Sequence, residues 1–229
     1  MALILFDFDG ALADTLGDLL QFGQEACDEL GVNHTATHDD LNSLEVMSFA
    51  TYGTQLEVPD ELLAEFVRRC LEKFGEKKSP PGIFAGLGEV IRELSTNHVL
   101  GIVTGNSSDN VKAFLSAHGL DDCIRAIYGV DSPGSKVEKI SLAQNQFAAG
   151  GEAVCMVGDS ASDIRAAREA GVKSIAVGWG HQSAETLLRA RPDILTHSPS
   201  ELREAILKLT AKSNDWLGKD LPERNESWT

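Results

Sequence analysis

Residues 3–15 read Leu-Ile-Leu-Phe-Asp-Phe-Asp-Gly-Ala-Leu-Ala-Asp-Thr, and this stretch decides how the rest of the chain is interpreted. The apolar run Leu3–Phe6 has the length of a buried strand. Asp7 and Asp9 follow it, and Gly10 allows the chain to turn sharply. Ligands of open α/β sheets bind at the carboxyl ends of the strands, so the pattern predicts a strand that leads into a functional site.

Two carboxylates this close in sequence repel each other unless a cation or a shared proton holds them. A divalent ion is the simplest solution, and Mg²⁺ takes oxygen ligands while keeping several waters. A carboxylate can also attack phosphorus and form an aspartyl-phosphate. The alternative is a capped turn, because Asp and Gly are common turn residues. Asp7 argues against that alternative, since a charge that ends an apolar strand needs compensation.

The composition is that of a globular protein with a real core: of 229 residues, 42% are hydrophobic and 24% are charged. This length suits one domain plus an insert. No apolar run approaches the ~20 residues that span a bilayer, and the start lacks the basic region and cleavage site of a signal peptide. We therefore expect a cytoplasmic protein.

The net charge is −15, which argues against nucleic acid and against an anionic membrane as partners of the whole surface. A small anionic substrate is still compatible, because a metal and a few cations can reverse the sign of the potential inside a cleft. The cysteines include no Cys-x-x-Cys pair. We expect all four to be buried apolar side chains: Cys27, Cys70, Cys123 and Cys155.

Residues 33–80 are polar and helical in pattern, and they contain no continuous apolar strand. We expect residues 15–82 to form a helical insert between the first strand and the rest of the sheet. Three helices are predicted here: 15–30 followed by Gly31, 39–44, and 61–74 ending at Gly75. The stretch 44–53 has no clean period. We expect it to pack against the core or, as the alternative, to form a loop that faces a substrate.

Strands and helices alternate after Gly82. Strands are predicted at 99–103, 124–130, 153–157, 174–177 and 193–195. Helices are predicted at 87–94, 109–118, 135–149, 162–170 and 199–209. The alternation predicts an α/β fold, with a mostly parallel sheet covered by helices on both faces. The tail 212–229 is polar, and we expect it to be poorly ordered.

Polar residues follow one of these strands and begin one of these helices. Thr104 comes directly after an apolar strand, and its hydroxyl and the N–H groups of Gly105 and Asn106 suit phosphate oxygens as well as an ordinary turn. Lys136 lies at the start of a predicted helix, where a cation opposes the helix dipole and needs a nearby anion or solvent. Lys139, one helical turn later, competes with Lys136 for the same role.

A second acidic signal lies at the end of another apolar strand. Gly158 and Asp159 end that strand, and Asp163 follows four residues later. Asp159 is a candidate metal ligand from a neighbouring strand. Asp163 is a candidate for orienting a metal-bound water or Lys136. Its alternative role is structural, because a negative charge in the first turn of a helix interacts favourably with the helix dipole.

In this order the segments resemble the four motifs of the haloacid dehalogenase-like (HAD) hydrolases: Asp-x-Asp-Gly, a strand-end Thr, a helical Lys and Gly-Asp-x-x-x-Asp. The resemblance covers about residues 1–210 and is closest to the phosphoglycolate phosphatase and β-phosphoglucomutase branch. It implies a Rossmann-like core formed by 1–14 and 83–211, with a helical cap formed by 15–82.

The resemblance also implies roles for the acids. Asp7 would be the nucleophile and a ligand of Mg²⁺. Asp9 would act as general acid and then base, and would give its backbone carbonyl to the metal. Asp159 would bind Mg²⁺ through its side chain, and Asp163 would support the site.

The transferring phosphoryl group would be bound by Thr104, Gly105, Asn106 and Lys136. The chain departs from the family pattern at position 11, which is Ala where Thr or Val is usual, and this change in a turn has little expected effect. The second motif reads Thr-Gly-Asn where many relatives have Thr or Ser followed by Asn. Which backbone N–H meets phosphate therefore stays open.

The motifs together predict a Mg²⁺-dependent phosphatase that acts on a small phosphorylated metabolite. A phosphomutase shares every core residue and is the main alternative, and a metabolite-binding protein without catalysis is another. A dehalogenase fits less well, because dehalogenases of this family lack the acid found here as Asp9. A phosphonatase also fits less well, because phosphonatases usually lose the same acid. The sequence leaves the substrate and the oligomeric state open.

Overall fold

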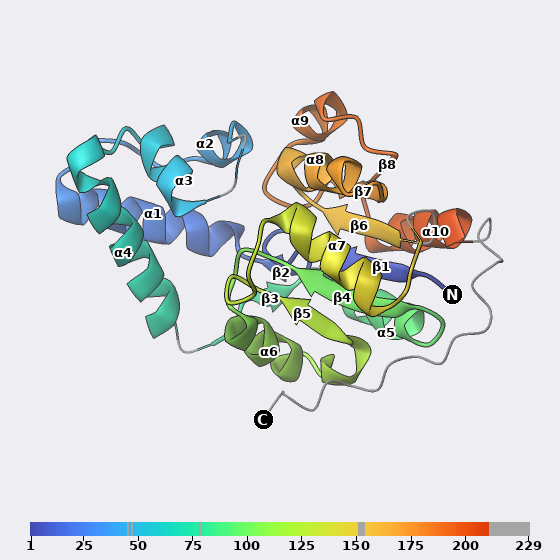
Figure 1. The fold of residues 1–229 in the computed structure, drawn as a ribbon. Helices are drawn as coiled ribbons and strands as arrows, with labels where there is room; N and C mark the ends of the chain where they lie inside the picture. The colour runs from blue at the N-terminus through green and yellow to red at the C-terminus, as the bar shows by residue number, and fades with distance from the viewer. Residues whose placement is uncertain (45, 47, 78, 151–153, 211–229) are drawn as a thin grey trace.

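A six-stranded parallel sheet forms the centre of the molecule, as predicted. The computed structural model describes residues 1–210 except 45, 47, 78 and 151–153 (Figure 1). The strand order is β5-β4-β1-β6-β7-β8, and every pair is parallel. The strands are β1 (Leu3–Phe6), β4 (Val99–Val103), β5 (Ala126–Tyr128), β6 (Val154–Gly158), β7 (Lys173–Val177) and β8 (Ile194–Thr196).

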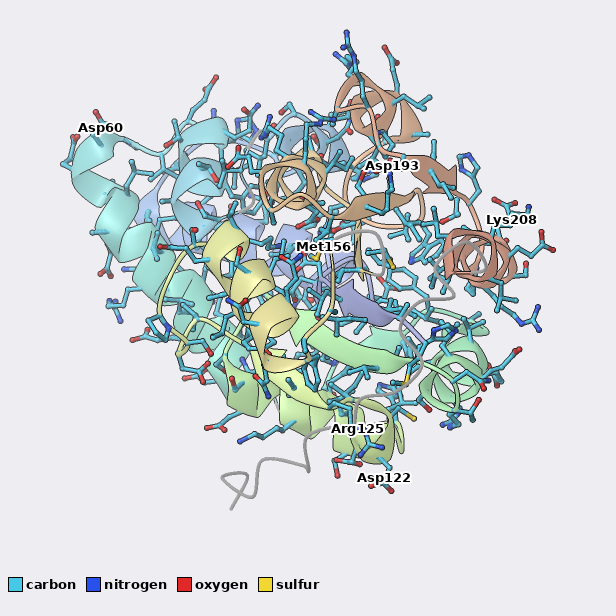
Figure 2. The ribbon with its side chains drawn as sticks, turned by 45° about the vertical axis from the view of Figure 1, so that its right-hand side comes forward. Asp60, Asp122, Arg125, Met156, Asp193 and Lys208 are labelled. Atoms are coloured by element: carbon cyan, nitrogen blue, oxygen red, sulfur yellow. The ribbon has the colours of Figure 1, made fainter. Side chains whose placement is uncertain are left out.

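Strand β1 is buried on both faces, which explains why it is a continuous apolar run. Leu3 and Leu5 face a cluster formed with α7 (Lys136–Gln146) and α8 (Ala161–Glu169). Ile4 and Phe6 face the opposite cluster, to which three helices contribute. These helices are α5 (Leu87–Ser95), α6 (Ser108–Ala117) and α10 (Pro199–Thr210). Figure 2 shows helices on both sides of the sheet, with Met156 of β6 between them.

Four helices lie to one side of the sheet and pack around an apolar cluster of their own (Figure 1). We call residues 16–76 the helical insert. Its helices are α1 (Leu16–Leu30), α2 (His38–Asn42), α3 (Phe49–Gln55) and α4 (Asp60–Glu76). The chain enters and leaves the insert through β2 (Ala13–Asp14) and β3 (Gly82–Ile83), which pair antiparallel. This short ribbon brings the two ends of the insert together.

Helix α3 is a difference from the prediction for 44–53. Ser48 and Thr51 form a capping box at its start, and the Tyr52 side chain is buried. The Phe49 ring contacts Phe74 with ring centroids 5.5 Å apart. These contacts come from residues distant in sequence, so local periodicity does not reveal the helix. The stretch therefore packs, as expected, but on the apolar cluster of the four helices rather than on the core around the sheet.

The predicted end of α4 at Gly75 was wrong, because the helix continues to Glu76. A glycine inside a helix costs only about 1 kcal/mol. The Phe74 ring in this last turn packs on Phe22 and Phe49, and each aromatic pair contributes about 0.5–1.5 kcal/mol beyond burial, a size comparable to the cost of the glycine. Strands β2 and β3, helix α9 (Ala184–Arg189) and a 3₁₀ turn at Asp121–Cys123 were also not predicted.

All four cysteines are buried, as predicted. We predicted poor order for residues 212–229, which lie outside the described part of the chain. The first residue of the predicted strand 153–157, Ala153, also lies outside it. Among the helices that the structure describes, none has both the length and the apolar character needed to cross a bilayer.

Candidate active site

The carboxyl ends of three adjacent strands converge on one site. Strand β1 pairs with β4 on one side and with β6 on the other. Asp7, Thr104 and Asp159 each come at or just after the end of one of these strands. From β1 the chain first adds β4 and β5 on one side of the sheet and then β6, β7 and β8 on the other side. Open α/β sheets bind their ligands at such a change in strand order.

Three carboxylates form the centre of the site. Single oxygens of Asp7, Asp159 and Asp163 lie within 4.8 Å of one another. The side chains of Asp159 and Asp163 are each 1% exposed, whereas that of Asp7 is 13% exposed. Hard carboxylate oxygens at this spacing fit a divalent cation such as Mg²⁺.

Lys136 contacts two of the three acids. Its Nζ lies 3.1 Å from Asp7 Oδ1 and 2.5 Å from Asp163 Oδ1. Ser135 caps α7, so Lys136 is the first residue of that helix. Burial disfavours the charged ammonium, but the carboxylates outweigh burial and raise the pKa of Lys136.

Lys139, the alternative to Lys136 for contacting the acids, lies in a different position. Its Nζ donates to the carbonyl of Gly129 at 2.6 Å and lies 3.4 Å from that of Thr104. Lys139 thus connects two backbone segments beside the site, whereas Lys136 reaches the acids.

The acids are crowded enough to retain a proton when no metal is bound. Burial raises the pKa of Asp7 to about 8, the charge of Lys136 opposes this rise, and the charges of Asp163 and Asp159 add to it. The Lys136 ammonium forms ion pairs with only two of the three clustered carboxylates. This excess of negative charge is the second reason why a divalent cation fits the donor set.

Asp9 lies apart from this cluster and has its own partner. Asn106 Nδ2 donates to Asp9 Oδ2 at 3.0 Å. The Asn106 Oδ1 accepts from the N–H of Ser107 at 2.8 Å and from Asn110 at 2.9 Å, which fixes the orientation of the amide. Burial raises the pKa of Asp9, and the Asn106 hydrogen bond opposes the rise. A carboxyl group with a raised pKa suits general acid–base chemistry.

The turn after β4 distinguishes the backbone N–H groups of Gly105 and Asn106 as candidates for binding a phosphate oxygen. The N–H of Asn106 donates to Thr104 Oγ1 at 3.0 Å, so that N–H already has a partner inside the turn. The N–H of Gly105 is therefore the better candidate for a phosphate oxygen. The Asn106 side chain acts on Asp9, a contact that the sequence did not predict.

Two further residues at the site were missed from the sequence. His181 donates from its backbone N–H and its ring to Asp159 Oδ2, with N···O distances of 2.7 Å and 3.1 Å. Thr15 Oγ1 lies 3.2 Å from His181 Nε2. Burial opposes the charged imidazolium, but the Asp159 carboxylate outweighs it and raises the pKa of His181. The sequence signal for His181 was its position just after the end of strand β7, two residues after Trp179.

Comparison with known proteins identifies the family. The family model of the haloacid dehalogenase-like hydrolases matches residues 4–177. A phosphoglycolate phosphatase of Synechococcus elongatus is 29% identical, over 91% of this chain and 99% of its own length. A probable phosphatase of Dickeya dadantii, IndB, is 28% identical over 91% of this chain and 96% of its own.

The fold is shared with solved structures as well. A haloacid dehalogenase-like hydrolase of Streptococcus pneumoniae superposes with a TM-score of 0.80 at 22% identity, and the match covers 90% of this chain and 98% of that one. The match of the family model covers most of the chain and extends from within strand β1 to the end of strand β7. The chain therefore belongs to the haloacid dehalogenase-like hydrolases.

Proposed function

We propose that this chain is a Mg²⁺-dependent phosphatase that hydrolyses a small phosphorylated metabolite, either a phosphoglycolate-like acid or a sugar phosphate. The observation that carries the proposal is the meeting of the Lys136 ammonium with the buried acids at the ends of β1 and β6. The phosphatase names of the relatives from Synechococcus elongatus and Dickeya dadantii support it.

Asp7 is the proposed nucleophile. It is the most exposed of the three clustered acids, at 13% against 1% for the other two, so a substrate reaches it most easily. A bond forms from an Asp7 oxygen to phosphorus while the bond from phosphorus to the leaving alcohol breaks. Lys136, 3.1 Å from Asp7, neutralises charge on the transferring phosphoryl oxygens.

Asp9 is the proposed general acid and base. Its raised pKa favours the protonated form that gives its proton to the leaving alkoxide. The resulting carboxylate then takes a proton from the water that hydrolyses the aspartyl-phosphate on Asp7. Asn106 holds Asp9 through the 3.0 Å hydrogen bond during both steps.

Asp7, Asp159 and the backbone carbonyl of Asp9 are the proposed holders of Mg²⁺. When bound, the cation supplies charge neutralisation for the attacking carboxylate and for the phosphoryl group. Asp163 supports the site by fixing Lys136, and its other oxygen accepts from Ser160 Oγ at 2.7 Å.

We also propose that residues 15–82 act as a cap over a core formed by 1–14 and 83–211. The separate apolar cluster of the helical insert and its attachment through the β2–β3 ribbon support this division. A cap excludes water from the reacting phosphoryl group and offers a surface for choosing the leaving alcohol.

The test is a panel of phosphate monoesters that includes 2-phosphoglycolate, sugar phosphates and p-nitrophenyl phosphate, assayed with Mg²⁺ and with EDTA. We expect release of inorganic phosphate that requires Mg²⁺ and is lost in Asp7→Asn. Turnover that survives Asp7→Asn contradicts the proposal. Conversion of a sugar 1-phosphate to its 6-phosphate identifies a phosphomutase instead. Stabilisation by metabolites without any turnover identifies a binding protein.

A further inference from the structure

We infer that His181 is a positioning residue that fixes the Asp159 carboxylate for a divalent cation and connects this carboxylate to helix α2 of the helical insert. The inference rests on the proposed function, because it assumes that Asp159 is a metal ligand. It adds a residue outside the acidic cluster and makes the metal site depend on contacts made by the insert.

The first reason is that His181 binds Asp159 twice through the same oxygen. Asp159 Oδ2 accepts the backbone N–H of His181 at 2.7 Å and the ring Nδ1 at 3.1 Å. Both contacts are made to Oδ2, so His181 holds one oxygen of this carboxylate and fixes the direction in which the carboxylate offers Oδ1 to a cation.

The second reason is close packing around this pair. A Cβ atom at Gly10 would lie 2.0 Å from Asp159 Oδ2 and 2.6 Å from His181 Nδ1. A Cβ at Gly180 would lie 2.4 Å from the Cβ of Asp159. Both positions are glycine, so the backbone approaches the pair closely from two sides. The Asp159–His181 pair therefore has little room to change its geometry.

The third reason is the contact between residues 181–183 and the insert. The carbonyl oxygen of His181 lies 2.7 Å from His38 Nε2 of helix α2. The N–H of Ser183 donates to Asn42 Oδ1 of the same helix at 2.7 Å. The Gln182 side chain accepts from the N–H of Ala161 at 2.7 Å, which holds this segment against the start of α8. Residues 181–183 therefore bridge α2 and the acidic site.

Binding of Mn²⁺ to the metal-free protein tests the inference without any substrate. We compare wild type, His181→Ala and His181→Asn by isothermal titration calorimetry. Loss of a partner of a metal ligand typically weakens metal binding by about 10–100-fold, so we expect at least about tenfold weaker binding in His181→Ala. The amide nitrogen of Asn takes the place of Nδ1, so we expect His181→Asn to bind within about threefold of wild type.

The outcomes separate the two proposals. A folded His181→Ala that binds Mn²⁺ like wild type overturns the positioning role, and so does a His181→Asn variant as weak as His181→Ala. A wild-type protein that binds no Mn²⁺ overturns the proposed function, and this inference falls with it. Asp159→Asn serves as the control for direct loss of a ligand.

The contact with the insert is tested by His38→Ala, which changes an exposed residue and leaves the acidic cluster intact. Loss of one hydrogen bond to the 181–183 segment should weaken Mn²⁺ binding by about threefold. The matched control is Asp39→Asn, an exposed neighbour on the same helix, and it should bind like wild type. Equal affinities of His38→Ala and Asp39→Asn overturn the connection between α2 and the metal site. This arm remains informative if His181→Ala does not fold.

Discussion

Replacement of Asp7 by Asn should abolish turnover and, at the same time, stabilise the metal-free protein. The amide has nearly the same shape as the carboxylate but is a poor nucleophile and carries no charge. Loss of a nucleophile costs at least about 10³-fold in kcat. The gain in stability follows because burial disfavours the charged form of Asp7 and because the neighbouring acids repel it.

The size of the gain can be worked from the distances. Asp7 has two acidic neighbours within 4.8 Å, and at an effective dielectric constant of about 20 each pair costs about 3.5 kcal/mol when ionised. The Lys136 ammonium at 3.1 Å returns about 5 kcal/mol on the same scale. These charges alone disfavour the ionised Asp7 by about 2 kcal/mol, and burial, the largest cause of its raised pKa, adds to this. Since about 2 kcal/mol is the lower bound of the gain, we expect Asp7→Asn to raise Tm by at least about 4 °C in a chain of this length.

The gain should depend on pH with a definite sign. The pKa of Asp7 is raised from 3.8 to about 8, so the folded state holds a proton that the unfolded state has already lost. Stability of the wild type therefore falls as pH rises between these two values, relative to Asp7→Asn. The difference in Tm between the two proteins should grow from about pH 4 and become constant above about pH 8.

The assay combines steady-state phosphate release with thermal unfolding in EDTA across this pH range. The matched control is Asp14→Asn, because Asp14 is an exposed acid of the same N-terminal segment and should leave both readouts unchanged. Activity of Asp7→Asn above about a tenth of wild type refutes the nucleophilic role. A Tm below that of wild type at pH 8 refutes the calculated repulsion.

Three further changes test separate parts of the structure. Lys136→Met should lower kcat by about 10²–10³-fold and destabilise the metal-free protein by about 3 kcal/mol, because two buried carboxylates lose their cation; urea unfolding that matches wild type contradicts this. Gly10→Ala should cost more than about 1 kcal/mol, because φ is +76° and the new Cβ would lie 2.0 Å from Asp159 Oδ2; an unchanged Tm would show that the turn relaxes. Phe114→Ala should cost about 3–5 kcal/mol in urea unfolding, because the ring is buried against Phe8 with centroids 5.0 Å apart; a loss below about 1 kcal/mol would mean that the core collapses into the space.

The sequence by itself determined the parallel α/β fold and the strand ends that carry acids. The run Leu3–Phe6 is apolar throughout because β1 is buried on both faces, so composition alone marks it as a central strand. Ser135 marks a predicted helix start through its contact with Glu138, three positions later, whereas the cap at Ser160 places the start of α8 slightly before the predicted 162. These signals are local, and a local signal can be seen without knowledge of the fold. The roles assigned to the acids stay predictions.

Only the tertiary structure decided which side chains meet. Lys136 and Lys139 lie one turn apart on the same helix, and the docking of α7 against the sheet alone directs the first to Asp7 and the second to a carbonyl. Helix α3 depends on a partner far along the chain, since Phe49 packs on Phe74. The position of His181 likewise depends on Asp159. Such contacts leave no periodicity in the sequence, because they arise from how distant elements pack rather than from the spacing within one element.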